Sequence, residues 1–350
     1  MFANRRLSLT HAAELADYEQ AWPKMHEFLD AKGYELRKRY RPGWVPSWTP
    51  RGGSNWPKTG WPEDSIIPRT RNFIDAKRDV IRDGKRVRER VGLKLVKLDE
   101  KIGVQEIEIL EYLSSREVRD DPRNPCIPLL EILHPPSHPN QRLLVMPLLY
   151  EVISPPLKRK SECVEFLRQI LRGMEFLHGH KIAHKDICPH NLVVHAPGLY
   201  PEGCHPMDNT RSEDGLSYAE IKDLRKVKPT YYFIDFGLSI MYGSPKQRWE
   251  RRPLRGRYSD VPEYDRPGPW DGYKVDIYCM GLLIDELVVK RRKNMDFLGP
   301  LVEWMTREEP SERPTAQQAV EWFDEATSGP KWRRTLGNVF SFLQTRSTSP

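Results

Sequence analysis

Two short segments of this 350-residue chain combine residue types and spacings that suit phosphoryl chemistry. The first runs from His184 to Asn191 and places Asp186 five positions before the asparagine. Transfer of a phosphoryl group needs a carboxylate that holds the attacking hydroxyl and a side-chain amide that reaches a metal ion. In the second segment an apolar run leads into Asp235-Phe236-Gly237, which puts a carboxylate where Mg²⁺ can bridge phosphates. We therefore expect Asp186 to be catalytic, and Asn191 and Asp235 to bind Mg²⁺.

These elements resemble the catalytic loop and metal-binding motif of eukaryotic-type protein kinases. Val261-Pro262-Glu263 is similar to the Ala-Pro-Glu that closes the kinase activation segment. The resemblance implies that Glu263 forms an ion pair with Arg313. It also implies that Asp276 holds the backbone of the catalytic loop and that His184 has a packing role.

The resemblance covers roughly residues 69–326 and implies an α+β, bilobal protein-kinase-like fold. It would have a small β-rich N-lobe, a larger helical C-lobe and an irregular N-terminal extension. We expect four parts: an extension over 1–68, an N-lobe over 69–149, a C-lobe over 150–328 with an insertion at about 195–230, and a tail over 329–350.

The N-lobe supplies a lysine and a glutamate by the same resemblance. Val91-Gly92-Leu93-Lys94 is similar to the family's Val-Ala-Ile-Lys, so Lys94 is expected to hold the nucleotide phosphates. Strand alternation puts Gly92 and Lys94 on one face, whereas the alternative, Lys97, lies on the other. Glu106 is the expected partner of Lys94, because apolar residues follow it at helical spacing. Glu108 is the alternative.

Adenine recognition is expected from the segment Met146-Pro147-Leu148. Pro147 has no N–H to donate, so the backbone of Leu148 or Leu149 would serve. Met146 would be the gatekeeper, although plain core packing explains it equally well.

No G-x-G-x-x-G turn precedes Lys94. Such a turn lets backbone N–H groups approach phosphates. Because this turn is absent, we keep three functional hypotheses, of which the third is less favoured.

The first hypothesis is ATP- and Mg²⁺-dependent transfer of the γ-phosphate to Ser or Thr of a protein substrate. Ser/Thr is preferred because Lys185 follows His184 and no Ala-Ala-Arg run follows Asp186. The second is a pseudokinase that acts as a binding scaffold. A small-molecule phosphotransferase is less favoured, because the Glu263, Arg313 and Asp276 constellation serves a protein-substrate activation segment.

The chain resembles most closely the kinase-like proteins that are numerous in mushroom-forming fungi. Their hallmarks include a Tyr-Arg-Pro-Gly-Trp segment ahead of the small lobe, here Tyr40 to Trp44, and a proline-containing insertion before Asp-Phe-Gly, here between Asn191 and Asp235.

The elements that must position these residues can be read from periodicity. Apolar residues at spacings of three and four predict a helix over 15–29, which Pro23 breaks into two and Gly33 ends. Prolines, glycines and four tryptophans exclude regular structure over 42–68. The remaining expected elements, in chain order, are strands at 73–76 and 91–96 joined by a turn at 83–84, a helix over 104–113, a strand at 143–146, a helix capped by Ser161 that ends near Gly179, a helix over 275–288, and a helix opened by Thr315 with Gln318.

Composition narrows the class of protein. With 38% hydrophobic residues and a net charge of +7 the chain can bury a core, and its longest apolar run is too short to span a bilayer. Five scattered cysteines predict reduced thiols in an intracellular protein of the cytoplasm or nucleus. Neither a nucleic-acid nor a membrane partner is expected.

Two clusters of residues outside the motifs, one basic and one rich in histidine, can be explained with or without a function. Residues 244–257 contain six basic residues and one acidic residue, which predicts either a solvated loop or attraction for acidic substrates or for a phosphate on Ser239, Tyr242 or Ser259. The histidines between His178 and His195 match no common zinc spacing, so metal ligation by them is disfavoured.

Overall fold

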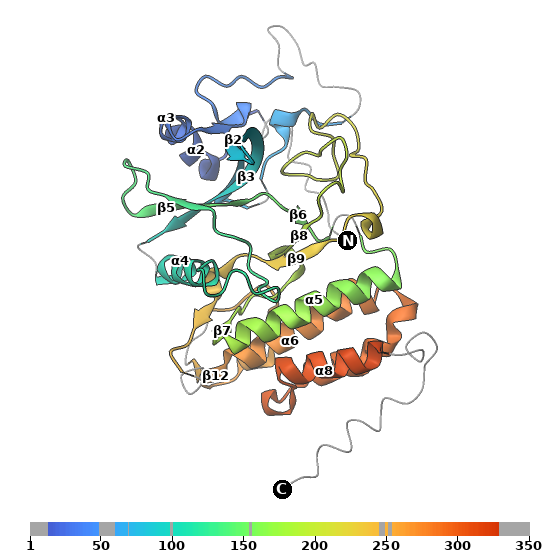
Figure 1. The fold of residues 1–350 in the computed structure, drawn as a ribbon. Coiled ribbons are helices and arrows are strands. Elements are labelled where there is room, and N and C mark those ends of the chain that lie inside the picture. Colours follow the sequence, from blue (N-terminus) through green and yellow to red (C-terminus); the bar gives the residue numbers. More distant parts are fainter. Residues whose placement is uncertain are drawn as a thin grey trace. The chain divides into compact units, whose positions relative to one another are not determined.

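The computed structural model describes residues 13–48, 60–68, 70–98, 101–153, 156–244, 249–250 and 254–328 (Figure 1). The chain divides into two compact units, each assembled from three segments. The first comprises Met1–Val104, Ile127–Pro155 and His195–Pro229, and the second comprises Gln105–Cys126, Pro156–Val194 and Thr230–Pro350. One unit is rich in strands and the other is mainly helical, which confirms the predicted α+β class.

The first unit is built on a five-stranded antiparallel sheet with the order β1-β2-β3-β5-β4. The strands are β1 (Tyr34–Leu36), β2 (Phe73–Arg82), β3 (Lys85–Lys97), β4 (Glu131–Leu133) and β5 (Gln141–Pro147), and a short strand β6 (Tyr150–Glu151) follows. The predicted strands at 73–76, 91–96 and 143–146 are confirmed. Sequence analysis missed β1, whose three residues carry too little alternation to be recognised.

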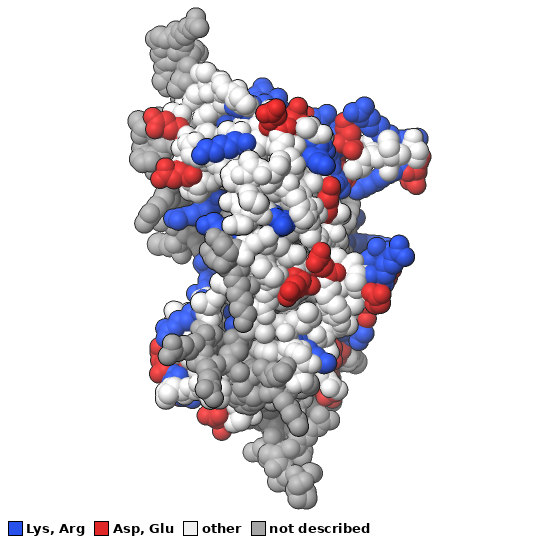
Figure 2. Space-filling view, turned by 90° about the vertical axis from the view of Figure 1, so that its left-hand side faces the viewer, with Lys and Arg blue, Asp and Glu red and all other residues white. Residues whose placement is uncertain are grey.

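A tight turn joins β2 to β3. Asp83 and Gly84 have φ angles of 50° and 73°, the left-handed pair that a two-residue hairpin turn requires. Ion pairs follow along both strands, among them Arg86 with Asp79, in which the arginine is exposed, and the half-buried pair of Arg78 with Glu89. On the face shown in Figure 2, basic and acidic side chains of the described residues are interspersed in the same way.

The two faces of this sheet differ in character. One face is apolar and packs against α2 (Ala21–Lys24) and α3 (His26–Ala31), which lie beside β2 and β3 in Figure 1. The buried cluster between them consists of Trp22, Met25, Leu29, Tyr34, Leu36, Tyr40, Ile74, Ala76, Val91, Leu93, Leu133, Leu143 and Val145. The opposite face carries Asp75, Gly92 and Lys94, because paired residues of adjacent strands share a face.

The predicted N-terminal helix is indeed divided in two. The break lies at Met25, between α2 and α3, so Pro23 lies inside α2. A proline is tolerated there because the first turn of a helix leaves its N–H groups unbonded. Gly33, with φ of 83°, ends α3 as expected.

The described parts of the connections in the first unit are irregular, as their proline and glycine content predicts; residues 49–59 of the predicted irregular segment lie outside the described residues. Short 3₁₀ turns occur at Asp17–Glu19, Lys38–Tyr40, Glu63–Ser65 and Leu224–Lys226. Isolated bridges, His205 with Asp208 and Arg211 with Tyr218, fold the insertion over 195–229 back on itself.

The second unit is organised around long helices. They are α4 (Lys101–Leu113), which belongs to this unit from Gln105 onward, α5 (Lys160–Gly179), α6 (Gly272–Ile284), α7 (Gly299–Met305) and α8 (Ala316–Thr327). Figure 1 shows α5, α6 and α8 side by side. A π-helical turn, Asp285–Val289, extends α6, and a 3₁₀ segment, Lys293–Leu298, precedes α7.

Helix starts follow their capping residues. The Thr315 hydroxyl accepts a hydrogen bond from the backbone N–H of Gln318, and the Gln318 side-chain oxygen accepts one from the backbone N–H of Thr315, as predicted. The expected cap at Ser161 is wrong, because Ser161 lies within the first turn of α5. There Glu162 instead accepts from the backbone N–H groups of Lys158 and Arg159.

Short strands and 3₁₀ turns frame the loops of the second unit. The strands are β7 (Ile182–Ala183), β8 (Leu192–His195), β9 (Thr230–Phe233), β10 (Ile240–Met241), β11 (Trp249–Glu250) and β12 (Trp270–Asp271), with β7 paired to β10, β8 to β9 and β11 to β12. The turns are Pro189–Asn191, Phe236–Leu238, Pro262–Asp265 and Pro310–Glu312. All five cysteines are buried thiols. Among the described residues no helix has the length and apolar character needed to cross a membrane.

Candidate active site

The predicted catalytic loop begins directly after β7 and ends in the 3₁₀ turn that leads into β8. Asn191 Nδ2 donates to the backbone oxygen of Asp186 at 2.9 Å and to its Oδ2 at 2.8 Å. Lys185 has a φ of 66°, a left-handed conformation that costs free energy for a residue with a side chain. Surrounding contacts must therefore hold the loop in this shape.

A buried aspartate of α6 supplies those contacts. Asp276 accepts hydrogen bonds from the backbone N–H groups of His184, at 2.8 Å, and Lys185, at 2.6 Å. His178 Nε2 lies 2.9 Å from the same carboxylate. Hydrogen bonds to an ionised acceptor are stronger than neutral ones. The loop-holding contact that the kinase resemblance implies for Asp276 is present.

Asp235 follows β9 and lies next to the loop. The N–H of Ile234 donates to the backbone oxygen of Asn191 at 3.0 Å, and His184 Nε2 lies 3.1 Å from the backbone oxygen of Ile234. Burial raises the pKa of Asp186, and the nearby Asp235 carboxylate adds to this, against the opposing effect of its hydrogen bonds from Arg257 and Asn191. The structure thus brings Asp186, Asn191 and Asp235 together.

This donor set fits a magnesium ion. A carboxylate and a side-chain amide offer the oxygen ligands that Mg²⁺ prefers, and phosphate oxygens commonly complete its shell. A cation would also relieve the repulsion between Asp186 and Asp235 that raises the Asp186 pKa. Within the described residues no group of three or more His, Cys, Asp or Glu side chains could hold a metal, so binding here would depend on Asn191.

The end of the activation segment contacts Asp186 directly. The backbone N–H of Arg257 donates to Asp186 Oδ1 at 2.6 Å. A Cβ atom on Gly256 would lie only 2.7 Å from that oxygen and 2.6 Å from the backbone oxygen of Lys185. Only a glycine at position 256 allows this close approach. Most of the remaining basic segment, residues 245–248 and 251–253, lies outside the described residues.

The ion pair expected between Glu263 and Arg313 is present. Arg313 Nη1 and Nη2 donate to the two Glu263 oxygens at 2.6 and 2.8 Å, and both side chains are buried. The remaining N–H groups of Arg313 donate to the backbone oxygens of Lys274, Arg307 and Glu308. Every N–H of this buried guanidinium therefore has an acceptor.

Lys94 and Glu106 lie on the predicted elements. Lys94 is half-buried on β3, opposite Phe73 of β2 and Leu144 of β5, whereas Lys97 is exposed. Glu106 is buried on α4 and Glu108 is exposed. Lys94 belongs to the first unit and Glu106 to the second, so their pairing stays a prediction.

The segment expected to bind adenine spans the end of β5 and the residues after it. Met146 is buried and pairs with Gly92 across the strands, while Leu148 and Leu149 are half-buried between β5 and β6. Their roles also stay predictions.

The place of a glycine-rich turn is taken by a long connection. Leu36 pairs with Ala76 and Phe73 pairs with Lys94, so the chain leaves β1 and enters β2 at the Lys94 end of the sheet. Residues 37–72 make this connection. On the same face, a Cβ atom on Gly92 would lie 2.5 Å from the Phe73 ring. In this conformation the Phe73 ring occupies the space beside Gly92 on that face.

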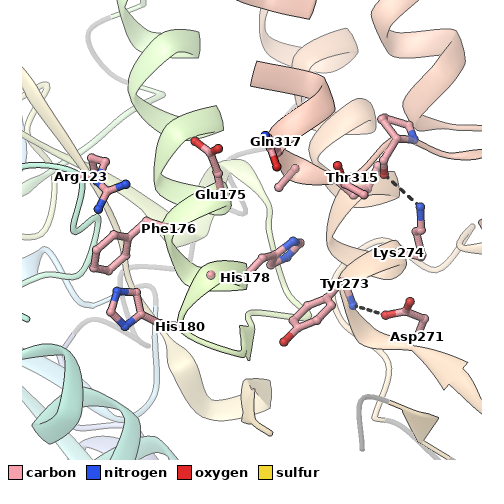
Figure 3. A pocket seen from close by; sticks show the side chains of 14 residues that line it. Arg123, Glu175, Phe176, His178, His180, Asp271, Tyr273, Lys274, Thr315 and Gln317 are labelled. Carbon is pink, nitrogen blue, oxygen red and sulfur yellow. Dashed lines mark hydrogen bonds between the residues drawn. The ribbon is translucent and has the colours of Figure 1, made fainter. Parts of the chain in front are cut away.

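A separate cavity lies in the second unit (Figure 3). Its volume is about 670 Å³, and its wall includes Phe176, His178, Tyr273 and Lys274. His178 faces this cavity and also contacts Asp276, which holds the catalytic loop. Sequence analysis considered His178 only as a metal ligand, and no motif in the sequence pointed to its contact with Asp276.

No family model matches the chain. Curated proteins nevertheless show similarity. The chain is 25% identical over 213 residues to a protein of Encephalitozoon cuniculi named probable casein kinase II subunit alpha homolog. The aligned region covers 60% of this chain and 54% of that protein. It is 30% identical over 210 residues to a putative mitogen-activated protein kinase 14C of Drosophila melanogaster, covering 55% and 44%.

A third match is cyclin-dependent kinase 7 of Caenorhabditis elegans, 29% identical over 122 residues, with 35% of this chain and 27% of that protein covered. The chain thus spans about half, or less, of the length of these relatives. The finer resemblance to kinase-like proteins of mushroom-forming fungi stays a prediction. The ordered motifs, the β-rich and helical units and these similarities together support a eukaryotic-type protein kinase domain in this chain.

Proposed function

We propose that this chain is a protein kinase that transfers the γ-phosphate of ATP to Ser or Thr hydroxyls of a protein substrate. The observation that carries the proposal is that Asp186, Asn191 and Asp235 lie close together. The loop that bears Asp186 and Asn191 is held in place by backbone N–H groups that donate to the Asp276 side chain. In phosphoryl transfer the protein contributes mainly positioning and electrostatic stabilisation. A preorganised loop of this kind supports that role.

Asp186 would orient the substrate hydroxyl and accept its proton. Its Oδ1 accepts from Arg257 and its Oδ2 from Asn191, but each carboxylate oxygen has a second lone pair for the hydroxyl. The raised pKa of Asp186, caused first by burial, makes the carboxylate a stronger base. Both hydrogen bonds fix the carboxylate plane before substrate arrives.

Asn191 and Asp235 would hold Mg²⁺. The bound nucleotide and metal would supply the phosphoryl group and neutralise its charge. We retain Lys94 and Glu106 as the pair that positions phosphates, and the backbone of Leu148 or Leu149 with Met146 as the adenine contacts.

The substrate is proposed to be a protein. The buried Glu263–Arg313 pair fixes the end of the activation segment within a few residues of Arg257, which contacts Asp186. Such an anchored segment suits an extended peptide better than a small molecule. An acidic peptide would suit the basic residues between 244 and 257. Buried thiols at all five cysteines are consistent with an intracellular location, in the cytoplasm or nucleus.

The proposal is tested by phosphotransfer from radiolabelled ATP to a peptide library with Mg²⁺ or Mn²⁺. Asp186→Asn is expected to lower the rate at least about 100-fold, because general-base groups contribute roughly 10² to 10⁴. The control is Asp120→Asn, which changes an exposed carboxylate with the same chemistry. Equal activity in Asp186→Asn and the unmodified chain would reject the proposed role. Labelling of small alcohols but no peptide would favour a small-molecule phosphotransferase.

A binding scaffold without phosphotransfer is the second candidate. It is favoured by one observation, the Phe73 ring beside Gly92 on the Lys94 face. Absence of phosphotransfer under all metal conditions, together with retained folding, would support the scaffold over the kinase.

A further inference from the structure

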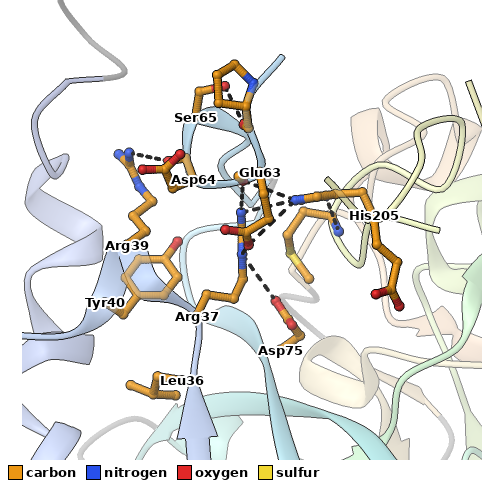
Figure 4. Close-up of polar contacts among 12 residues, drawn as sticks. Leu36, Arg37, Arg39, Tyr40, Glu63, Asp64, Ser65, Asp75 and His205 are labelled. Atoms are coloured by element: carbon orange, nitrogen blue, oxygen red, sulfur yellow. Dashed lines mark hydrogen bonds and ion pairs between the residues drawn. The ribbon is translucent and has the colours of Figure 1, made fainter. Parts of the chain in front are cut away.

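A polar cluster on the Lys94 face, in which Arg37, Asp75 and His205 are buried, joins three parts of the first unit that are distant in sequence. We call it the latch, and it consists of Arg37, Glu63, Asp75, Arg90, His205 and Glu213. Arg37 and Glu63 come from the connection between β1 and β2, Asp75 and Arg90 from the sheet, and His205 and Glu213 from the insertion. Figure 4 shows the Arg37 guanidinium between Glu63, Asp75 and His205.

The contacts of the latch run from the connection to the insertion. Arg37 Nε lies 2.5 Å from Glu63 Oε1 and 3.9 Å from Asp75 Oδ1. Arg37 Nη2 donates to the Glu63 backbone oxygen and lies 3.1 Å from His205 Nε2.

From the sheet, Arg90 Nη1 lies 3.3 Å from Asp75 Oδ2, and Arg90 Nη2 lies 3.2 Å from Glu213 Oε1. Two arginines of the first unit thus tie the insertion to the sheet.

The register places the latch where a nucleotide would contact this sheet. Asp75 pairs with Gly92, and Arg90 precedes Gly92 by two positions, so both side chains share the face of Lys94. The Phe73 ring already lies against Gly92 on that face. The latch therefore covers the face with side chains of the protein itself.

A second contact docks the insertion independently of the latch. The N–H of Trp61 donates to the backbone oxygen of Gly215 at 2.9 Å. Gly60 and Gly215 approach the opposing backbone so closely that a Cβ atom would lie 2.3 Å from Leu216 O in one case and 1.9 Å from Trp61 O in the other. The rings of Tyr150 and Tyr200, with centroids 4.5 Å apart, add a contact to the segment after β5.

The latch is incompletely satisfied. Arg37 Nη1 and Asp75 Oδ1 are buried without a hydrogen-bond partner among the described residues. His205 Nδ1 accepts from the N–H of Met207, so in the neutral ring Nε2 carries the proton and is directed at the Glu63 backbone oxygen, 3.2 Å away.

That tautomer makes Nε2 a donor, and it then faces a second donor, Arg37 Nη2, which uses the same oxygen. Buried polar groups with missing or competing hydrogen-bond partners weaken the network in which they lie. Other interactions can therefore displace the contacts of the latch.

We propose that the insertion over 195–229 is a built-in cap on the Lys94 face, closed by the latch, and that it must release before a nucleotide binds. This deepens the proposed function, because the ligand it regulates is the nucleotide of that function.

The test compares two glycine substitutions with the same backbone requirement. Gly215 and Gly198 have φ angles of 76° and 78°, but a Cβ atom meets Trp61 at position 215 and nothing within 4 Å at position 198. Gly215→Ala and Gly198→Ala therefore share the cost of a left-handed alanine, and only Gly215→Ala pushes the cap off the connection. Gly60→Ala attacks the same contact from the other side.

Binding of a fluorescent ATP analogue with Mg²⁺ is measured for each full-length variant. We expect Gly215→Ala and Gly60→Ala to bind at least tenfold more tightly than the unmodified chain and Gly198→Ala. Hydrogen exchange should rise over residues 199–216 in the two releasing variants only. If Gly215→Ala does not fold, Glu213→Gln, which removes one contact of Arg90 with the insertion, takes its place.

Equal affinity in all variants overturns the cap, and so does absence of binding in all of them. Tight binding in the releasing variants without phosphotransfer leaves the cap standing and rejects the kinase activity. Phosphotransfer by the unmodified chain at the same rate as by Gly215→Ala rejects the cap and leaves the activity standing.

Discussion

Two buried arginines, Arg313 in the second unit and Arg37 in the first, show how differently the two units treat charge. All N–H groups of Arg313 have acceptors, two of them the oxygens of Glu263. Arg37 leaves Nη1 without a partner and directs Nη2 toward a second donor. A fully satisfied network fixes one conformation, whereas a partly satisfied one marks a segment that can exchange partners. The catalytic loop is thus prebuilt, and the Lys94 face is held closed more weakly.

Removing each arginine tests this contrast directly. Arg313→Met is expected to cost about 3–5 kcal/mol of stability, because it leaves the Glu263 carboxylate buried and alone. Arg37→Met is expected to cost about 1–3 kcal/mol, because Asp75 keeps Arg90 and an unsatisfied donor is removed with the side chain. The free energy of unfolding of each unit is measured by urea unfolding, with hydrogen exchange in α6 reporting on the second unit and in β2 on the first.

The control is Arg172→Met, which breaks an exposed ion pair with Asp324 and should cost less than about 1 kcal/mol. Equal costs for Arg313→Met and Arg37→Met would remove the distinction between the two networks.

The pH dependence of stability sharpens the same comparison. Burial, together with the nearby charges of Arg37 and Arg90, lowers the pKa of His205 to about 3. The unfolded chain therefore binds the proton more readily, so stability is complete above the ordinary pKa of 6.5 and falls as pH drops from 6.5 toward 3. Between pH 7 and pH 5 the loss should be about 2 kcal/mol.

Thermal unfolding of the full chain at both pH values checks this, with His205→Gln as the comparison because its side chain does not titrate. The variant should lose less stability between the two pH values than the unmodified chain. Parallel pH profiles would show that His205 is not held neutral, and the proposed strain in the latch would lose its support.

Helix capping gives the smallest expected effect. Thr315→Ala removes the capping box of α8 and should lower stability by about 1 kcal/mol, detected as faster hydrogen exchange in the first turn of α8. Gln317→Ala, two positions on and exposed, should change little. In the first unit α3 has Met25 as its N-cap and no side-chain capping bond, so there packing has to replace capping.

The catalytic loop could be predicted because its information is local. Asp186 and Asn191 are five positions apart, and that spacing alone lets the amide reach back to the carboxylate. The hairpin turn at Asp83 and Gly84 and the cap at Thr315 are local in the same sense. Each needed only a few neighbouring residues, which periodicity and turn chemistry describe well.

The latch could not be predicted, because its partners meet only through the fold. Arg37 and His205 are 168 positions apart, and neither stands in a recognisable motif. Strand β1 is too short for its alternation to be read, yet its register decides where the connection leaves the sheet. The sequence shows only that the glycine-rich turn is absent. The structure shows that the connection between Leu36 and Phe73 takes its place.

The interleaved order of the segments also constrains how the protein is made. The first unit needs its last segment, His195–Pro229, before the Arg37 and Asp75 side chains meet His205. At a synthesis rate of about 5–20 residues per second, the insertion leaves the ribosome on the order of ten seconds after the segments of the sheet. A chain whose sheet forms during synthesis would therefore pass through an interval in which the Lys94 face is open, and a ligand or chaperone present at that moment could reach it before the insertion does.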